Sequence, residues 1–211
     1  LAWSAIGLAV TKLTEQGPEL TQIELEVDQI ATASIPLLVT IKEINADVIQ
    51  VQGWLTDIAA TRGLPGFDDG FTEAEGFAKK FEADVKMADE LATSLELPEV
   101  RKALGELSDA FGPFYEGGKI MAQAYIDSGP EGGNPQMGNF DSVAGKMGEA
   151  TEALLTLVDQ KTASTLAELQ THTKHMHSAN TQLVTLLLII SGVSAVVMAI
   201  GTIYLYLTLT R

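Results

Sequence analysis

Residues 20–58 read LTQIELEVDQIATASIPLLVTIKEINADVIQVQGWLTDI, and this stretch decides the fold. One series of positions, with Ser34 filling a single step, advances by alternating threes and fours: Leu20, Ile23, Val27, Ile30, Ser34, Leu37, Ile41, Ile44, Val48, Val51, Leu55 and Ile58. A repeat of 3.5 residues is typical of a long helix packed in a coiled-coil-like seam. Because Pro36 removes a backbone hydrogen bond, we expect a kink near it.

A second helix is predicted after the breaker TRGLPGFDDGF, residues 61–71. Thr72 and Glu75 have the spacing of a capping box at its start. Its apolar positions follow a helical period: Ala74, Phe77, Phe81, Val85, Ala88, Leu91 and Leu95. The sequence therefore predicts an amphipathic helix that ends before Pro98.

Two more helices complete the prediction. Pro98 suits the first turn of the third, and GPEGGNP, residues 129–135, is expected to end it as a loop. The third seam is Val100, Leu104, Leu107, Phe111, Phe114, Gly118, Met121 and Tyr125. A fourth helix begins near Gln136 and shows Phe140, Val143, Met147, Leu154, Val158, Leu166, Leu169 and Met176. The predicted fold is all-α, an up-down four-helix bundle with long first and last helices that continue into transmembrane helices.

The membrane prediction comes from residues 183–209, which contain no charged side chain. About 20 apolar residues suffice to span a bilayer, so we expect a transmembrane helix over 181–211. Tyr204 and Tyr206 suit its interface, and Arg211 suits a cytoplasmic end.

The N-terminal segment LAWSAIGLAV is too short to span a bilayer by itself. We expect residues 1–11 to be the end of a truncated first transmembrane helix, and the remnant of a cleaved signal peptide is the alternative. On the first interpretation, residues 12–180 form an extracytoplasmic sensor domain.

The composition excludes several classes of partner and of chemistry. Acidic residues outnumber basic ones 28 to 13, giving a formal charge of −15, which speaks against nucleic acid as a partner. The chain has no cysteine, which excludes disulfides, thiolate metal sites and cysteine nucleophiles. It also lacks a P-loop, a dinucleotide-binding glycine pattern, an H-E-x-x-H motif and a nucleophile elbow. We therefore predict no enzyme activity, no catalytic residues and no cofactor.

Two stretches resemble a known family. They are WLTDIAATRGLPGFDDGFTEAEGFAKKF, residues 54–81, and GKIMAQAYIDSGPEGGNPQMGNFDSVA, residues 118–144. Together they resemble the ligand-binding regions of bacterial methyl-accepting chemotaxis proteins of the four-helix-bundle type. The resemblance implies a homodimeric receptor in the bacterial inner membrane with a periplasmic or extracellular sensor domain.

The same resemblance implies a function in signal transduction. Such a receptor detects a small-molecule ligand or a periplasmic binding protein and signals through its last helix to cytoplasmic chemotaxis signalling proteins. Related bundles also serve as input domains of sensor histidine kinases and diguanylate cyclases. A membrane-tethered helical scaffold without a ligand is a further alternative.

Arg62 is the first candidate ligand-binding residue, because a guanidinium can hold a carboxylate in a bidentate fork. The alternative is a salt bridge from Arg62 to Asp57, Asp68 or Asp69 that fixes the loop. Each alternative places the guanidinium at the far end of the first predicted helix.

Trp54, Tyr115 and Tyr125 are the other candidates, with Lys119 supplying a positive charge to a pocket. The alternative is that these aromatic rings belong to the core.

His172, His175 and His177 cluster just before the apolar segment. His172 and His175 share a helix face, as a metal-binding pair can, but the sequence offers no third ligand on that face. We therefore predict a polar collar at the interface and no metal site. Histidines also titrate near neutral pH, so this cluster is a candidate for a pH response.

Overall fold

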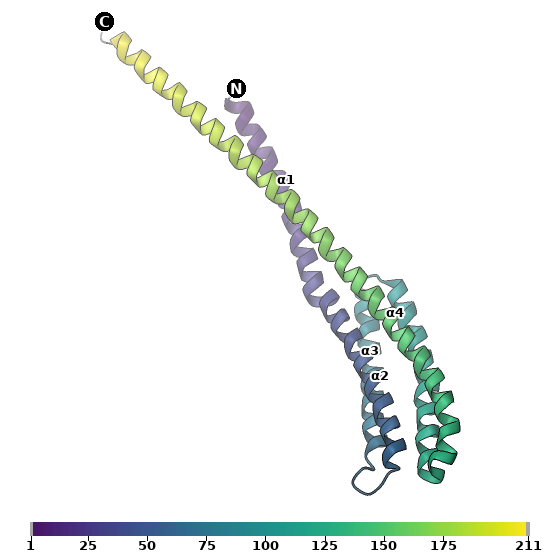
Figure 1. Cartoon of the computed structure of the whole chain (residues 1–211). Coiled ribbons are helices and arrows are strands. Elements are labelled where there is room, and N and C mark those ends of the chain that lie inside the picture. The colour runs from purple at the N-terminus through teal and green to yellow at the C-terminus, as the bar shows by residue number, and fades with distance from the viewer. Residues whose placement is uncertain (1, 210–211) are drawn as a thin grey trace. The chain divides into compact units, whose positions relative to one another are not determined.

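The computed structural model describes residues 2–209, and every long element in it is helical. The elements are α1 (Ala2–Gln29), the π-helical turn η1 (Ile30–Ser34), α2 (Ile35–Thr61), α3 (Gly70–Ser94) and α4 (Pro98–Leu209) (Figure 1). The chain divides into two units. One comprises residues 29–164 and the other comprises residues 1–28 together with 165–211, and each is described by itself below.

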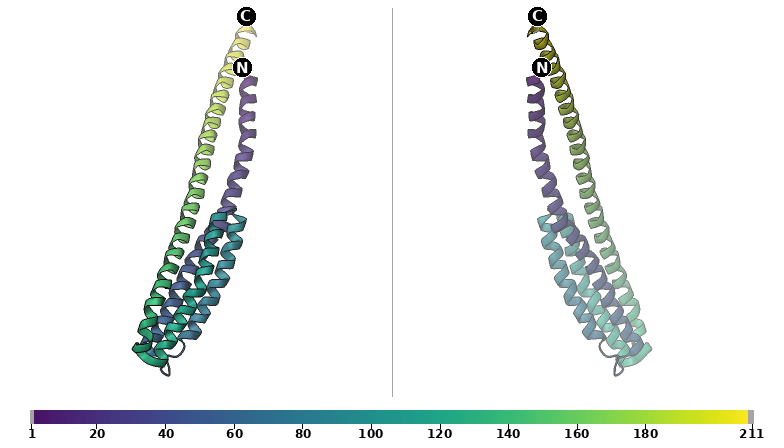
Figure 2. Two further views of the ribbon diagram at one scale, coloured as in Figure 1. Left: turned by 90° about the vertical axis from the view of Figure 1, so that its right-hand side faces the viewer. Right: turned by 90° about the vertical axis from the view of Figure 1, so that its left-hand side faces the viewer.

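The core of unit 29–164 is built from α2, α3 and the two stretches of α4 on either side of Gly129, which lie side by side (Figure 2). The predicted seam of residues 20–58 is buried at every position from Ile30 to Ile58. The third predicted seam is buried at all eight of its positions. Because a fully buried large apolar side chain contributes about 1.5–3 kcal/mol, these two seams dominate the stability of the unit.

Helix α3 buries a stripe that is partly different from the predicted one. Ala74, Phe81 and Ala88 are buried as expected, whereas Phe77, Val85, Leu91 and Leu95 are only half-buried. Ala78, Asp84 and Ala92 take buried positions instead. Alanines have small side chains, and helix axes approach more closely where the contact residues are small. The alanine stripe of α3 therefore faces the core and its larger side chains lie at the edge.

The expected loop at residues 129–135 was predicted wrongly. Residues 130–135 are helical, and within Pro98–Leu209 only Gly129 has non-helical backbone angles, φ 59° and ψ −151°. Glycine adopts such angles without a steric penalty, and the fixed φ of Pro130 suits the first turn that follows. The prediction holds at a coarser level: an all-α fold of packed helices whose last element is very long, without a separately counted fourth helix.

The backbone departs from α-helical geometry just before Pro36, where the sequence predicted a kink. Residues Ile30–Ser34 form a π-helical turn, and the N–H of Ile35 donates to the carbonyl of Ile30. A proline ring clashes with the carbonyl four residues earlier in an α-helix, and a wider turn relieves that clash.

The capping-box prediction is wrong. Helix α3 begins at Gly70, with Asp69 as its N-cap residue and no side-chain capping bond. Gly70 packs so tightly on α2 that an added Cβ would lie 2.6 Å from Ile58. This contact brings Thr72 into the first turn, and Glu75 instead pairs with Lys79 at 2.6 Å. Helix α4 begins at Pro98, as predicted.

In the other unit, most of the apolar side chains of α4 from Val184 to Ile203 are exposed, reaching 70% at Met198, whereas Leu186 and Ile190 are half-buried. Among the described residues one helix, α4, is long and apolar enough to cross a membrane. Backbone helix extends from Ala2, although membrane insertion of residues 1–11 stays a prediction. The side chains of Tyr204, Tyr206 and Arg211 lie outside the described part of the chain.

Gly129→Ala is predicted to destabilise unit 29–164 by about 1–3 kcal/mol, because this φ, ψ combination is essentially confined to glycine. Gly138→Ala is the matched control, since Gly138 is helical and exposed and nothing lies near an added Cβ. Alanine there should stabilise by about 0.5–1 kcal/mol. Chemical unfolding of the full chain in detergent, followed by circular dichroism, measures the free energy of unfolding of both variants. Equal changes in the two variants would contradict the non-helical backbone at Gly129.

Candidate functional site

Tyr115 and Lys119 are brought together as predicted. Lys119 Nζ lies 5.1 Å from the centre of the Tyr115 ring and 2.9 Å from Glu116 Oε1. Both residues line a shallow groove between α3 and α4 together with Phe71, Glu75 and Gln123. A cation over an aromatic face is attracted by the negative face of the ring.

The charges of this groove are fixed at neutral pH. Burial raises the pKa of Tyr115, so its phenol stays neutral. The hydrogen bond to Glu116 raises the pKa of Lys119, and the hydrogen bond from Lys79 lowers the pKa of Glu75. The groove therefore presents a cation, a carboxylate and two aromatic rings, which suits a small molecule that carries a carboxylate or an aromatic group.

Trp54 lines a different pocket, at the junction of α2 and α3, with Asp57, Phe67 and Asp69 among its walls. Its indole Nε1 is buried and has no hydrogen-bond acceptor in the described part of the chain. Leaving a buried donor unpaired costs about 1–3 kcal/mol. Trp54 is thus separate from the groove of Tyr115 and Lys119.

Arg62 ends α2 in the left-handed conformation, with φ 50°, and its side chain is exposed. Its Nη1 would lie 3.4 Å from a Cβ added at Gly129, so the guanidinium lies beside the reversal of α4. Within residues 2–209 it forms no salt bridge to Asp57, Asp68 or Asp69, so the predicted loop-fixing salt bridge is absent there.

Tyr125 belongs to the core rather than to a pocket wall. It is 7% exposed, and its hydroxyl donates to Asn134 Oδ1 at 2.7 Å. Its ring covers Gly133 so closely that an added Cβ would lie 2.3 Å away. The side chain therefore fastens the two stretches of α4 across Gly129.

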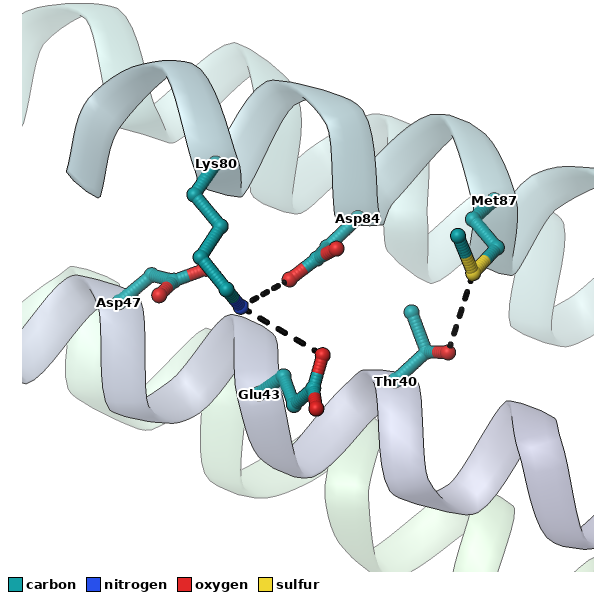
Figure 3. A network of polar contacts seen from close by, with 6 residues as sticks. All are labelled: Thr40, Glu43, Asp47, Lys80, Asp84 and Met87. Carbon is teal, nitrogen blue, oxygen red and sulfur yellow. Dashed lines mark hydrogen bonds and ion pairs between the residues drawn. The ribbon is translucent and has the colours of Figure 1, made fainter. Parts of the chain in front are cut away.

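A charged network that was not predicted from the sequence lies between α2 and α3 (Figure 3). Lys80 Nζ lies 2.7 Å from Asp84 Oδ2, 3.3 Å from Asp47 Oδ2 and 3.4 Å from Glu43 Oε2. Close by, the Thr40 hydroxyl donates to the sulfur of Met87 at 3.7 Å. The available signal was Asp47, one residue before Val48 of the buried seam. One lysine thus joins two buried carboxylates from different helices.

Burial is the main influence on Asp47, whose side chain is only 3% exposed. It raises the pKa of Asp47 to about 6, against the opposing charge and hydrogen bond of Lys80. Burial also lowers the pKa of Lys80, but the bonds and charges of Asp84 and Asp47 outweigh it and hold the pKa above its ordinary value. Buried charges persist only when they are paired, so this network fixes how α3 sits on α2.

Asp47→Asn is predicted to change the pH dependence of stability. Folding raises the pKa of Asp47, so the protonated carboxyl stabilises the folded state. This contribution to the free energy of unfolding is fully present below about pH 4 and is lost as pH rises through about 6. Between pH 4 and 7, the free energy of unfolding of the variant should therefore rise by on the order of 2 kcal/mol relative to that of the parent. Thermal unfolding of the full chain across this range measures the difference.

Asp109→Asn, at an exposed position of α4, is the control and should show no such gain. A constant difference between the Asp47 variant and the parent at all pH values would contradict the assigned burial of this carboxyl.

The predicted histidine collar faces carboxylates of α1 in the unit of residues 1–28 and 165–211. His172 Nδ1 lies 2.9 Å and 3.0 Å from the two carboxylate oxygens of Glu26. His175 Nδ1 lies 3.6 Å from Glu19 Oε1. No group of three metal-ligating side chains occurs among the described residues. The sequence could not pair these residues because 146 positions separate Glu26 from His172.

Comparison with known proteins adds no further constraint. No family model, no curated protein and no solved structure matches this chain. Its function is therefore inferred from the residues and contacts described above.

Proposed function

We propose that this protein is the sensor module of a transmembrane chemoreceptor. It detects a stimulus outside the cell and transmits it through α4 to a cytoplasmic signalling region in chemotaxis. One observation carries the proposal: helical structure runs unbroken from Pro130 to Leu209, and this single helix contributes both to a buried core and to an exposed apolar stretch.

On this proposal, unit 29–164 is an up-down four-helix bundle. Two contacts support a reversal of the chain at Gly129: the hydrogen bond from Tyr125 to Asn134, and the fit of Gly118 against both Leu55 and Phe140. The stretches of α4 before and after Gly129 then count as the third and fourth helices of the bundle.

The exposed apolar stretch supports a place in the inner membrane. Exposed apolar surface of this extent is costly in water and is ordinary in lipid, where a spanning helix needs about 20 such residues. Unit 29–164 would then lie on the periplasmic or extracellular side. Exposed apolar residues of α1, among them Leu13, Leu20 and Val27, would pack against a second copy of the chain in a homodimer.

The groove of Tyr115 and Lys119 is the proposed ligand site. A small molecule with a carboxylate or aromatic group would bind the lysine and the two rings. A periplasmic binding protein is the other candidate partner, and the exposed Leu64 and Phe67 of the loop between α2 and α3 suit contact with a protein. In either case the stimulus acts through unequal affinity for two arrangements of α4, and shifts of 1–2 Å are a known switching mode.

A thermal-shift screen of the full chain in nanodiscs, against amino acids, organic acids and aromatic metabolites, tests direct sensing. A compound that binds only the folded state at a hundredfold excess over its Kd should stabilise it by about 2.7 kcal/mol. Lys119→Met should abolish the shift, because it removes the cation of the groove.

Lys102→Met is the matched control, since Lys102 is exposed on α4 and pairs only with Glu106 among the described residues. A shift that survives in the Lys119 variant would place the ligand elsewhere. No shift with any compound, in protein shown to be folded, would contradict direct sensing by this groove.

A further inference from the structure

Two glutamate–histidine pairs join α1 and α4 within the unit of residues 1–28 and 165–211. His172 and His175 are three residues apart on α4, and Glu19 and Glu26 are seven apart on α1, so each pair of positions lies on one helix face. His172 contacts both oxygens of Glu26 at 2.9 Å and 3.0 Å, and His175 lies 3.6 Å from Glu19. Both contacts join a titratable side chain of α1 to one of α4.

The charge of these pairs depends on pH. Histidine side chains gain a proton between about pH 8 and pH 5, and each contact becomes an ion pair only when the imidazole is protonated. A hydrogen bond from Gln22 lowers the pKa of Glu26; burial opposes this, and the hydrogen bond and charge of His172 lower it further. Glu26 is therefore ionised across the range in which histidine titrates, and its charge is lost only in stronger acid.

We propose that His172 with Glu26, and His175 with Glu19, form an acid-strengthened clamp between α1 and α4. Above the range of histidine titration each contact is at most a neutral hydrogen bond, and within that range it becomes charge-assisted, which makes it shorter and stronger. The clamp involves only α1 and α4, so it does not depend on the proposed ligand groove.

The two pairs differ in their surroundings and should contribute unequally to the pH response. Lys12 lines the same surface pocket as Glu19 and His175, so this pair shares its surroundings with a permanent cation. Glu26 is also less exposed than Glu19, 15% against 45%, and is therefore less screened by solvent. Lys174 and His177 line neither of the two pockets that contain His175. The His172–Glu26 pair should supply most of the pH response.

Distance measurement by electron spin resonance tests the clamp. The chain has no cysteine, so Thr21→Cys on α1 and Thr173→Cys on α4 give two unique labelling positions, both exposed. With the labelled full chain in nanodiscs, the ratio of short to long distances should be about two- to fivefold higher at pH 5.5 than at pH 8.5, as expected for two partly exposed ion pairs.

Two variants and one control decide the assignment. Glu26→Gln should remove most of the change between the two pH values, and His172→Gln should do the same from the other helix. His177→Gln should leave the change intact, because His177 has no carboxylate partner among the described residues. Distance distributions that are identical at both pH values, or a pH response that survives both Glu26→Gln and His172→Gln, would overturn the proposal. Loss of every ligand shift with a retained pH response would count against the proposed function alone.

Discussion

The structure of unit 29–164 depends on the burial of one apolar seam, which η1 and α2 present from Ile30 to Ile58. A helix cannot bury its own apolar face, so other helices must pack on this seam. Helix α3 and both stretches of α4 do so. Aromatic rings extend the contact on the far side: Phe81 stacks on Phe111 at 3.9 Å between ring centres, and Phe114 lies 5.6 Å from Phe140. The requirement that α4 cover the seam twice explains why the chain must reverse at Gly129 and why Tyr125 and Gly133 fit so closely there.

The helical seams could be predicted from the sequence because spacing along one helix is a local property. The steps of three and four residues identify a buried face without reference to any partner, and the positions from Ile30 to Ile58 are buried as expected. The alanine stripe of α3 could not be predicted in the same way. Whether Ala78 or Phe77 faces the core depends on how closely α2 approaches, and that distance is a property of two helices.

The misassigned segment at 129–135 has a related cause. Three glycines and two prolines within seven residues favour a loop when each is considered alone. A proline costs little in the first turn of a helix, however, and Gly132 and Gly133 allow the backbone to lie against Ser128 and Tyr125. The composition that indicated a loop is therefore the composition of a sharp reversal between two helical stretches.

In the candidate site too, contacts within one helix could be predicted from the sequence, and contacts between distant segments could not. Tyr115 and Lys119 could be predicted to lie together because they are four residues apart on one helix. The other candidates are separate: Trp54 lines a pocket between α2 and α3, Arg62 ends α2, and Tyr125 is in the core. Lys80 and Asp84 are also four residues apart on one helix, but the contacts of Lys80 with Asp47 and of His172 with Glu26 join segments that are distant in sequence. No spacing rule reaches that far, so only the packed helices reveal them.

We propose that α4 serves both a water-exposed sensor unit and a membrane span, and the proposed function depends most on this. Accessibility of single nitroxide labels along α4, in the full chain in nanodiscs, tests this directly. From Val184 to Ile203 the labels should be relaxed by oxygen, which dissolves in lipid, and shielded from a water-soluble nickel reagent, whereas labels at the exposed Glu152 and at Asp159 should behave in the opposite way. Access of the nickel reagent along the whole helix would contradict a membrane span in α4.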